Sequence, residues 1–328
     1  MRENRTGTWF QSPEAYAFLA SQTEVMEVFA IGLTDEAERL RGVCVGYVTK
    51  EHSALKQWFS RRAIINGGAC LADDCRDEEV RALMTAVREH LKGKAIYIET
   101  RNFNDYSHWR KAFEQVGFGY QPHLNFHIDC SDRETMYSKM SDVRRRQVKK
   151  AINSGASIKS EGITEAEITA LYEILSRLYR TKVKTPLFPL EFFLSFHKNG
   201  AGKYLLVEYE GKVIGGMMCP ILTGGDNPAA LNARGCIYEW YVCGLDSEYK
   251  DQYPSVMATY AAMDYAASNG LERFDVMGAG QPGVPYGVRD FKSEFGGQLV
   301  EHGRFVNVQN PMLYRLGSFV VKRMKKLL

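Results

Sequence analysis

Hydrophobic and polar residues alternate along this chain with two different periods, and the period changes several times. Residues 25–31 and 42–48 are rich in β-branched side chains and bounded by charge and glycine, which predicts strands. In residues 78–91 apolar side chains recur every three or four positions, which predicts an amphipathic helix. Short strands are predicted at 95–99 and 120–128, with a helix at 106–116 between them. The first part of the chain therefore has an α/β pattern that ends near Cys130.

The second part of the chain opens with helices before strands return. Helices are predicted at 133–139, 141–153, 165–179 and 190–198. Strands are predicted at 203–208, 213–222, 236–242, 274–277 and 298–308, with a long helix at 255–268 that ends at Asn269-Gly270. A chain of 328 residues is long enough for two domains. We therefore expect domains at 1–130 and 131–328, the second carrying a helical insertion over 131–200.

The two domains are predicted to be copies of one α/β unit. In each copy a short strand comes first, and a glycine is followed nine residues later by a phenylalanine. The pairs are Gly117 with Phe126 and Gly296 with Phe305. The copies differ at one position of chemical interest, because Lys292 of the second copy corresponds to Phe113 of the first. The fold itself therefore does not require a cation at this position.

Lys292 lies in a stretch that combines an apolar strand, a glycine-bearing loop and a short helical turn. Phe291 and Phe295 are four residues apart, so they share one face of a helical turn, and Lys292 projects off that face. The adjoining Gly296-Gly297 pair allows close approach of backbone to a ligand. Ligands of α/β proteins usually bind at the carboxyl ends of strands. A lone lysine here could be a solvated side chain beside a turn, but these neighbours make a catalytic site that contains Lys292 and Phe291 at least as good an interpretation.

Two segments resemble the FemABX family of peptidoglycan-bridge aminoacyltransferases. One is Phe274-Asp275-x-x-Gly278 followed by Asp290-Phe291-Lys292-x-x-Phe295-Gly296-Gly297, and the other is residues 179–184 followed by 190–193. The resemblance implies an α/β (α+β) chain of two tandem GNAT-like domains, with mixed sheets flanked by helices. The best-known members also carry a long coiled-coil arm. No segment of this sequence is long enough for one, so we expect a member without the arm.

The resemblance also implies a reaction and its partners. An aminoacyl group would move from aminoacyl-tRNA to an amine of a lipid-linked or nucleotide-linked muropeptide, without a cofactor. Lys292 stands at the position of a key active-site lysine of the family. At or near the position of Lys184 the family often has an arginine, which helps to bind precursor phosphates. Lysine keeps the positive charge but lacks the two-pronged geometry of arginine.

The chemistry of ester aminolysis suggests further candidates. A cation stabilises the tetrahedral oxyanion, and Lys292 either does this or holds a phosphate of the donor. Arg289 is the other cation of this stretch, and Gly278 opens the loop to a substrate. Glu99 and Asp275 are candidate bases or amine-positioning groups, or else turn partners. Tyr238 and Tyr241 are candidate hydrogen-bond donors, or else buried aromatic residues.

Two other functions compete with aminoacyl transfer. A GNAT enzyme that uses acyl-CoA needs a glycine-rich loop before a helix, where free N–H groups hold the pyrophosphate. Residues 249–255 contain no glycine but do contain Asp251 and Pro254, and residues 75–79 place three acids at the matching helix start. We therefore expect no acetyl-CoA binding. The other alternative is a binding protein that has kept the fold without catalysis.

Composition and charge limit where the chain could contact nucleic acid or a membrane. The formal net charge is +3, so a surface for nucleic acid has to be local. Arg145, Arg146 and Lys149 on the predicted helix 141–153 suit tRNA phosphate or an anionic membrane, or form a solvated face. Residues 312–328 form a basic amphipathic pattern that either contacts the inner face of the membrane or packs on its own domain.

The seven cysteines are an odd number, and neither they nor the histidines show the spacing of metal ligands, so no zinc site is expected. The N-terminus lacks the pattern of a secretory signal, and no apolar run reaches the roughly 20 residues of a membrane span. A cytoplasmic protein fits these observations.

Overall fold

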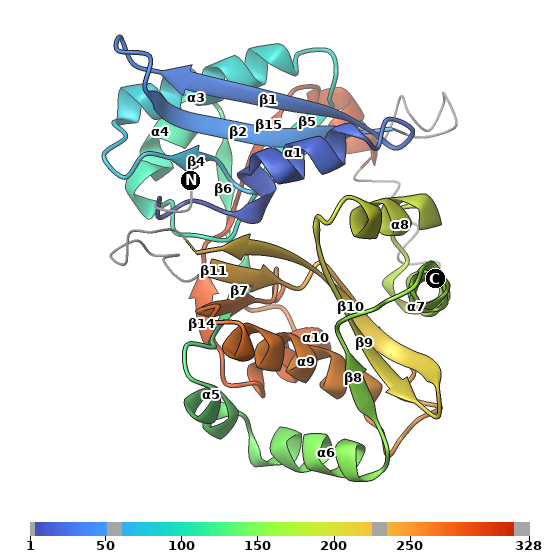
Figure 1. The fold of residues 1–328 in the computed structure, drawn as a ribbon. Coiled ribbons are helices and arrows are strands. Elements are labelled where there is room, and N and C mark those ends of the chain that lie inside the picture. Colours follow the sequence, from blue (N-terminus) through green and yellow to red (C-terminus); the bar gives the residue numbers. More distant parts are fainter. Residues whose placement is uncertain (1–3, 51–60, 225–234, 318–328) are drawn as a thin grey trace. The chain divides into compact units, whose positions relative to one another are not determined.

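The computed structural model describes residues 4–50, 61–224 and 235–317 of the chain. These residues form two compact units, each built on a β-sheet with packed helices (Figure 1). The first unit contains residues 4–123 together with the described residues from 301 onward, and the second contains residues 124–300. The predicted α/β class is confirmed.

The first unit has a sheet in the order β1-β2-β3-β5-β15-β6, with β4 paired to β2. Strands β3 and β5 are parallel, and the other pairs of this sheet are antiparallel. Helices α3 and α4 pack on the core face of this sheet. The strands are β1 (Met26–Thr34), β2 (Leu40–Thr49), β3 (Arg62–Gly67), β4 (Cys70–Leu71), β5 (Tyr97–Asn102), β6 (Gly119–Gln121) and β15 (Arg304–Val308). The helices are η1 (Trp9–Gln11), α1 (Pro13–Ala20), α3 (Asp77–His90), η2 (Ser107–Trp109) and α4 (Arg110–Gln115).

The second unit has a sheet in the order β14-β7-β13-β11-β10-β9-β8, with β12 paired to β10. Strands β11 and β13 are parallel, and β13 is antiparallel to β7. The strands are β7 (Leu124–Asp129), β8 (Ser157–Lys159), β9 (Gly202–Tyr209), β10 (Lys212–Thr223), β11 (Gly235–Tyr238), β12 (Tyr241–Gly244), β13 (Arg273–Asp275) and β14 (Gln298–Glu301). The helices are α5 (Arg133–Lys139), α6 (Asp142–Asn153), α7 (Glu165–Leu178), the π-helical turn η3 (Tyr179–Val183), α8 (Leu190–Lys198), α9 (Pro254–Ser268) and α10 (Gly287–Ser293).

The two copies of the α/β unit exchange their last strands. In the first copy β5, α4, β6 and β7 follow one another, and in the second copy β13, α10, β14 and β15 do so. Strand β7 lies between β13 and β14 in the sheet of the second unit, whereas β15 lies between β5 and β6 in that of the first. The register is also equivalent, because Val306 of β15 pairs with Glu99 and His127 of β7 pairs with Asp275.

This exchange moves the unit boundaries away from those expected from the sequence. The chain passes to the second unit after His123 rather than near Cys130, and returns to the first unit at Glu301. The reason is that β7 and β15 pair with the sheet of the other copy. Periodicity along the sequence identifies these strands but not the sheet in which they pair.

Most predicted elements are present with shifted ends. Three expected strands are each interrupted and form two. The strand 120–128 forms β6 and β7, the strand 236–242 forms β11 and β12, and the strand 298–308 forms β14 and β15, which lie in different sheets. Strand β3 and helix α1 were missed, although Ser12 caps α1 and Pro13 opens it, which is a helix-start signal. Residues 312–317 of the expected C-terminal helix are helical, and residues 318–328 lie outside the described part.

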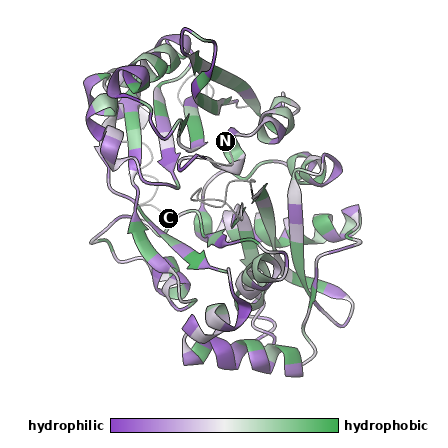
Figure 2. Ribbon diagram, turned by 60° about the vertical axis from the view of Figure 1, so that its left-hand side comes forward, coloured by the Kyte–Doolittle hydropathy of each residue, from purple (hydrophilic) through white to green (hydrophobic). Residues whose placement is uncertain are grey.

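Each unit encloses its own hydrophobic core. In the second unit Phe126, Ile128, Phe274 and Phe295 are buried against α5, α6 and α9. Hydrophobic residues run through the strands, and hydrophilic residues are frequent on the surrounding helices (Figure 2). Ser141 caps the N-terminus of α6, since its Oγ accepts a hydrogen bond from the Arg144 N–H at 3.2 Å. These contacts fix the segments that carry the candidate site.

Candidate functional site

The ammonium group of Lys292 is enclosed in the second unit. Its Nζ donates hydrogen bonds to the carbonyl oxygens of Val276 at 2.7 Å and Gly278 at 3.0 Å. It also lies 2.8 Å from Glu239 Oε1, and the Lys292 side chain is only 9% exposed. An ammonium group has three N–H donors, so these three acceptors satisfy all of them. Lys292 is therefore built into the fold, where the sequence alone suggested a side chain that projects toward a ligand.

Glu239 is the counter-charge that sequence reasoning missed. It lies at the interruption between β11 and β12, where its N–H donates to the carbonyl oxygen of Asp275 at 2.9 Å. Burial, opposed by the nearby Lys292 ammonium, raises the pKa of the Glu239 carboxyl. The sequence did contain a signal for this partner, because Glu239 is a lone glutamate inside an apolar strand pattern and a buried carboxylate needs a counter-charge.

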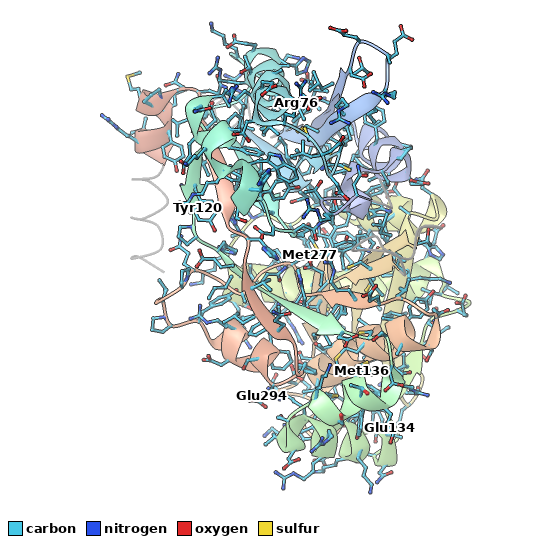
Figure 3. All side chains as sticks on the ribbon, turned by 90° about the vertical axis from the view of Figure 1, so that its left-hand side faces the viewer. Arg76, Tyr120, Glu134, Met136, Met277 and Glu294 are labelled. Carbon is cyan, nitrogen blue, oxygen red and sulfur yellow. The ribbon has the colours of Figure 1, made fainter. Side chains whose placement is uncertain are left out.

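The loop after β13 is held by hydrogen bonds on several sides. Met277 has the left-handed φ of 54°, which is rare for a residue with a side chain. Its N–H donates to Asp275 Oδ1 at 2.8 Å, and the Gly278 N–H donates to Asn125 Oδ1 at 2.8 Å. Lys292 binds the carbonyl groups on either side of Met277, which is labelled in Figure 3. The strained conformation therefore depends on Lys292, Asp275 and Asn125 together.

Asp275 and His127 form a buried carboxylate–imidazole pair. Asp275 is fully buried, and its Oδ2 lies 3.1 Å from His127 Nε2. Asn125 Nδ2 donates to Asp275 Oδ1 at 2.8 Å. Burial by itself would raise the pKa of Asp275, but His127, Arg273 and the Asn125 amide outweigh it and lower that pKa. Asp275 is thus held as a carboxylate.

The remaining residues of the Lys292 turn are structural contacts. Arg289 donates to the carbonyl oxygens of Gln281 at 2.8 Å, Ala279 at 3.4 Å and Val284, so it binds the glycine-rich loop. The Phe291 and Phe295 rings are in contact, with centroids 5.2 Å apart, as their spacing predicted.

Arg144 of α6 holds this turn from outside. Its guanidinium carbon lies 4.4 Å from the centroid of the Phe291 ring, and its Nε lies 3.2 Å from the carboxylate of Glu294. A Cβ atom at Gly296 would overlap the carbonyl oxygen of Lys139, so this glycine is needed for packing of the chain.

The structure assigns different surroundings to the two tyrosines and Lys184. Tyr238 is fully buried, and burial raises its pKa well above the ordinary value. Tyr241 is half-buried, with its ring 5.0 Å from that of Phe193 and 6.1 Å from that of Tyr179. Lys184 is exposed, ends η3 in a left-handed conformation with φ 55°, and lines a surface cavity of about 310 Å³. The other residues of this cavity are Ser176, Tyr179, Arg180, Thr185 and Leu187.

Glu99 belongs to the first unit, whereas Lys292 and Asp275 belong to the second. Its carboxylate is buried and paired with Arg304 Nη1 at 2.5 Å and Arg101 Nε at 3.4 Å. Burial would raise the pKa of Glu99, but Arg101 and Arg304 outweigh it and lower that pKa. Its carboxylate therefore already carries two cations in place of the amine expected from the sequence.

The basic residues of α6 are partly used by local contacts. Arg145 pairs with Asp142 and donates to the Ser138 carbonyl oxygen at 2.6 Å, and Arg146 donates to the Asp142 carbonyl oxygen at 3.3 Å. Lys149 is exposed. Within the described ranges, no group of three or more His, Cys, Asp or Glu residues is placed to hold a metal ion. None of the helices described here is long and apolar enough to cross a membrane.

Comparison with known proteins places this site in a family context. Residues 235–322, which contain both Glu239 and Lys292, match the model of the FemAB family. This segment is FemAB-like. The resemblance to the FemABX family expected from the sequence is thereby confirmed. Comparison with curated proteins gives no match.

Solved structures with the same fold cover nearly the whole chain. FemX is similar with a TM-score of 0.70 at 15% identity, over 96% of each chain. L-PGS from Bacillus licheniformis gives a TM-score of 0.57 at 11% identity, over 94% of this chain and 96% of that one. The C-terminal domain of a putative lysylphosphatidylglycerol synthetase from Agrobacterium fabrum gives 0.55 at 11% identity, over 94% and 91%. The fold is thus that of FemX, and the FemAB segment supports an acyltransferase.

Proposed function

We propose that this protein is an aminoacyltransferase of cell-wall synthesis, which moves an aminoacyl group from aminoacyl-tRNA to an amine of a peptidoglycan precursor peptide. One observation carries the proposal. The FemAB segment contains a buried Lys292–Glu239 ion pair that fixes a strained loop at the carboxyl end of β13. A buried pair of this kind costs desolvation energy, so a functional requirement is a good reason for its presence.

The reaction assigns a role to each group at this loop. The precursor amine attacks the ester carbonyl and a tetrahedral oxyanion forms. The ester C–O bond then breaks, and the amine proton passes to the leaving tRNA oxygen, which becomes a free hydroxyl. Lys292 acts by holding the loop in place, because its three N–H donors are taken by Val276, Gly278 and Glu239. His127, oriented by Asp275, accepts the amine proton and returns it to the leaving oxygen.

A CoA-dependent reaction has less support from the helix termini. Asp246 occupies the N-terminus of α9, where its Oδ1 accepts the Ser255 N–H at 3.0 Å and its Oδ2 accepts the Ser255 hydroxyl at 2.5 Å. At the start of α3, Glu79 Oε2 accepts the Arg76 N–H at 2.8 Å. A carboxylate at each position repels a pyrophosphate, which needs free N–H groups there.

The test is transfer from charged tRNA to a nucleotide-linked muropeptide, read by mass spectrometry as an added residue. The exposed Lys198→Met in α8 is the matched control for Lys292→Met, because Lys198 pairs with Glu165 at the surface. The proposal expects transfer by the wild type and Lys198→Met and little by Lys292→Met. Parallel reactions with phosphatidylglycerol vesicles as acceptor test a lipid product. A residue added only to lipid, or to neither acceptor, would overturn the proposal.

A further inference from the structure

Three arginines of the first unit gather on one face of its sheet. Arg101 of β5 and Arg304 of β15 are direct cross-strand partners. Arg62 of the neighbouring β3 pairs with Tyr97, two residues before Glu99 on β5. Residues two apart on a strand share a face, so Glu99 and Arg101 point to the same side. Like charges directly opposite each other in a sheet are unfavourable unless a counter-charge lies between them.

Glu99 supplies only part of that counter-charge. Its Oε1 contacts both Arg101 and Arg304, and Arg62 also acts on the Glu99 carboxylate. Burial and the nearby Arg304 lower the pKa of His123 to about 4, so the imidazole is neutral at neutral pH. The guanidinium groups of Arg62, Arg101 and Arg304 together with the Glu99 carboxylate carry a net charge of +2. The cluster therefore attracts an anion at neutral pH.

Several N–H donors of the two cross-strand arginines have no acceptor among the described residues. Arg101 donates only through Nε, to Glu99 at 3.4 Å, and its side chain is 33% exposed. Arg304 uses Nη1 for Glu99 and lies 3.0 Å from His123 through Nη2, while its buried Nε has no partner within the described ranges. A planar guanidinium matches the two oxygens of a carboxylate or phosphate.

We infer that Arg101 and Arg304 form an oxyanion-binding site on the first unit, which takes a carboxylate or phosphate group of a ligand. Glu99 limits the affinity of this site because its carboxylate competes for the same guanidinium groups. The equivalent position of the second copy is Asp275, which faces His127 in place of the arginine pair. The anion site is thus a property of the first copy alone. It stands apart from the proposed function, because anion binding is measurable without transfer.

The experiment is calorimetric titration of the full chain at low salt with two kinds of probe. Inorganic pyrophosphate tests a phosphate ligand, and a short peptide with a free terminal carboxylate, compared with the same peptide amidated, tests a carboxylate. We expect one equivalent of at least one probe to bind, and Arg101→Gln to weaken it by about tenfold or more. Arg39→Gln is the matched control, because Arg39 is an exposed arginine of the same unit paired with Asp35. It should leave the affinity unchanged.

Glu99→Gln provides a second test that is independent of Arg101. Removal of the competing carboxylate should strengthen anion binding by about tenfold, which a purely structural ion pair would not do. The site is refuted if the wild type binds neither probe, or if both Arg101→Gln and Glu99→Gln bind like the wild type. An Arg101→Gln protein that does not fold leaves the decision to Glu99→Gln.

Discussion

Replacement of Lys292 by methionine tests the central feature of the candidate site. A lysine that projected from a solvated turn could be replaced with the fold left intact, as the sequence alone suggested. The buried pair changes this expectation. Methionine keeps the apolar part of the side chain, but Glu239 loses its counter-charge and two carbonyl groups lose their donor. The variant should therefore lose stability as well as activity.

The size of the loss follows from these contacts. Breaking one side of a buried ion pair costs about 3–5 kcal/mol, because the remaining charge stays buried. With a urea dependence of about 3 kcal/mol per molar, the unfolding midpoint should fall by about 1–1.7 M. Adding Glu239→Gln to Lys292→Met removes the stranded charge and should recover part of the loss. The transfer rate of either variant should fall by about 10²–10³.

The loss should also depend on pH. Burial raises the pKa of Glu239, and removal of Lys292 takes away the main opposing influence, so that pKa rises further. A carboxyl group with a raised folded-state pKa contributes stability below its ordinary pKa of about 4.3 and loses it as the pH rises through the raised value. The loss of unfolding free energy in Lys292→Met should thus be largest at neutral pH and smaller in acid. Urea unfolding at several pH values measures it. A deficit below about 0.5 kcal/mol at pH 7 would refute the reasoning.

Three further predictions concern the same unit and the donor. The pKa of Asp275 is lowered in the folded protein, so its contribution to stability is present at neutral pH and is lost as the pH falls through that lowered value. Urea titrations of Asp275→Asn should show lower stability at pH 7 and a smaller further loss in acid. Arg144→Ala should destabilise by about 1–3 kcal/mol through lost contacts to Phe291 and Glu294, and Arg144→Lys by less, in thermal melts. Calorimetry with acetyl-CoA should show no binding because Asp246 occupies the α9 N-terminus, and micromolar binding would favour the acyl-CoA reaction.

The sequence predicted elements better than it predicted contacts. Helical and strand periods gave the positions of α3, α6, α8 and β10 to within a few residues, because each element buries one face. Periodicity says nothing about which sheet receives a strand, so the placement of β7 and β15 was missed.

The candidate site shows the same limit. Lys292 stood out through its glycine-rich surroundings and the FemABX-like motif. Its partner Glu239 lies 53 positions earlier in the sequence, and the strand order brings the two side chains together. Asn125 and His127 were missed for the same reason, because they reach Asp275 through the exchanged strand β7. Long-range contacts of this kind carry no local signal.

The reciprocal placement of β7 and β15 has a consequence for biosynthesis. Strand β15 lies between β5 and β6, so the sheet of the first unit stays open in its middle until residues 304–308 have left the ribosome. Many multidomain proteins fold in the order of synthesis, with the N-terminal domain first. The first unit cannot do so, because its sheet is incomplete until β15 has been made. A nascent chain that stops before residue 304 exposes two unpaired strand edges, which mark it for chaperones and proteases. Completion of the first unit's sheet therefore waits for β15, which is synthesised after the residues of the second unit.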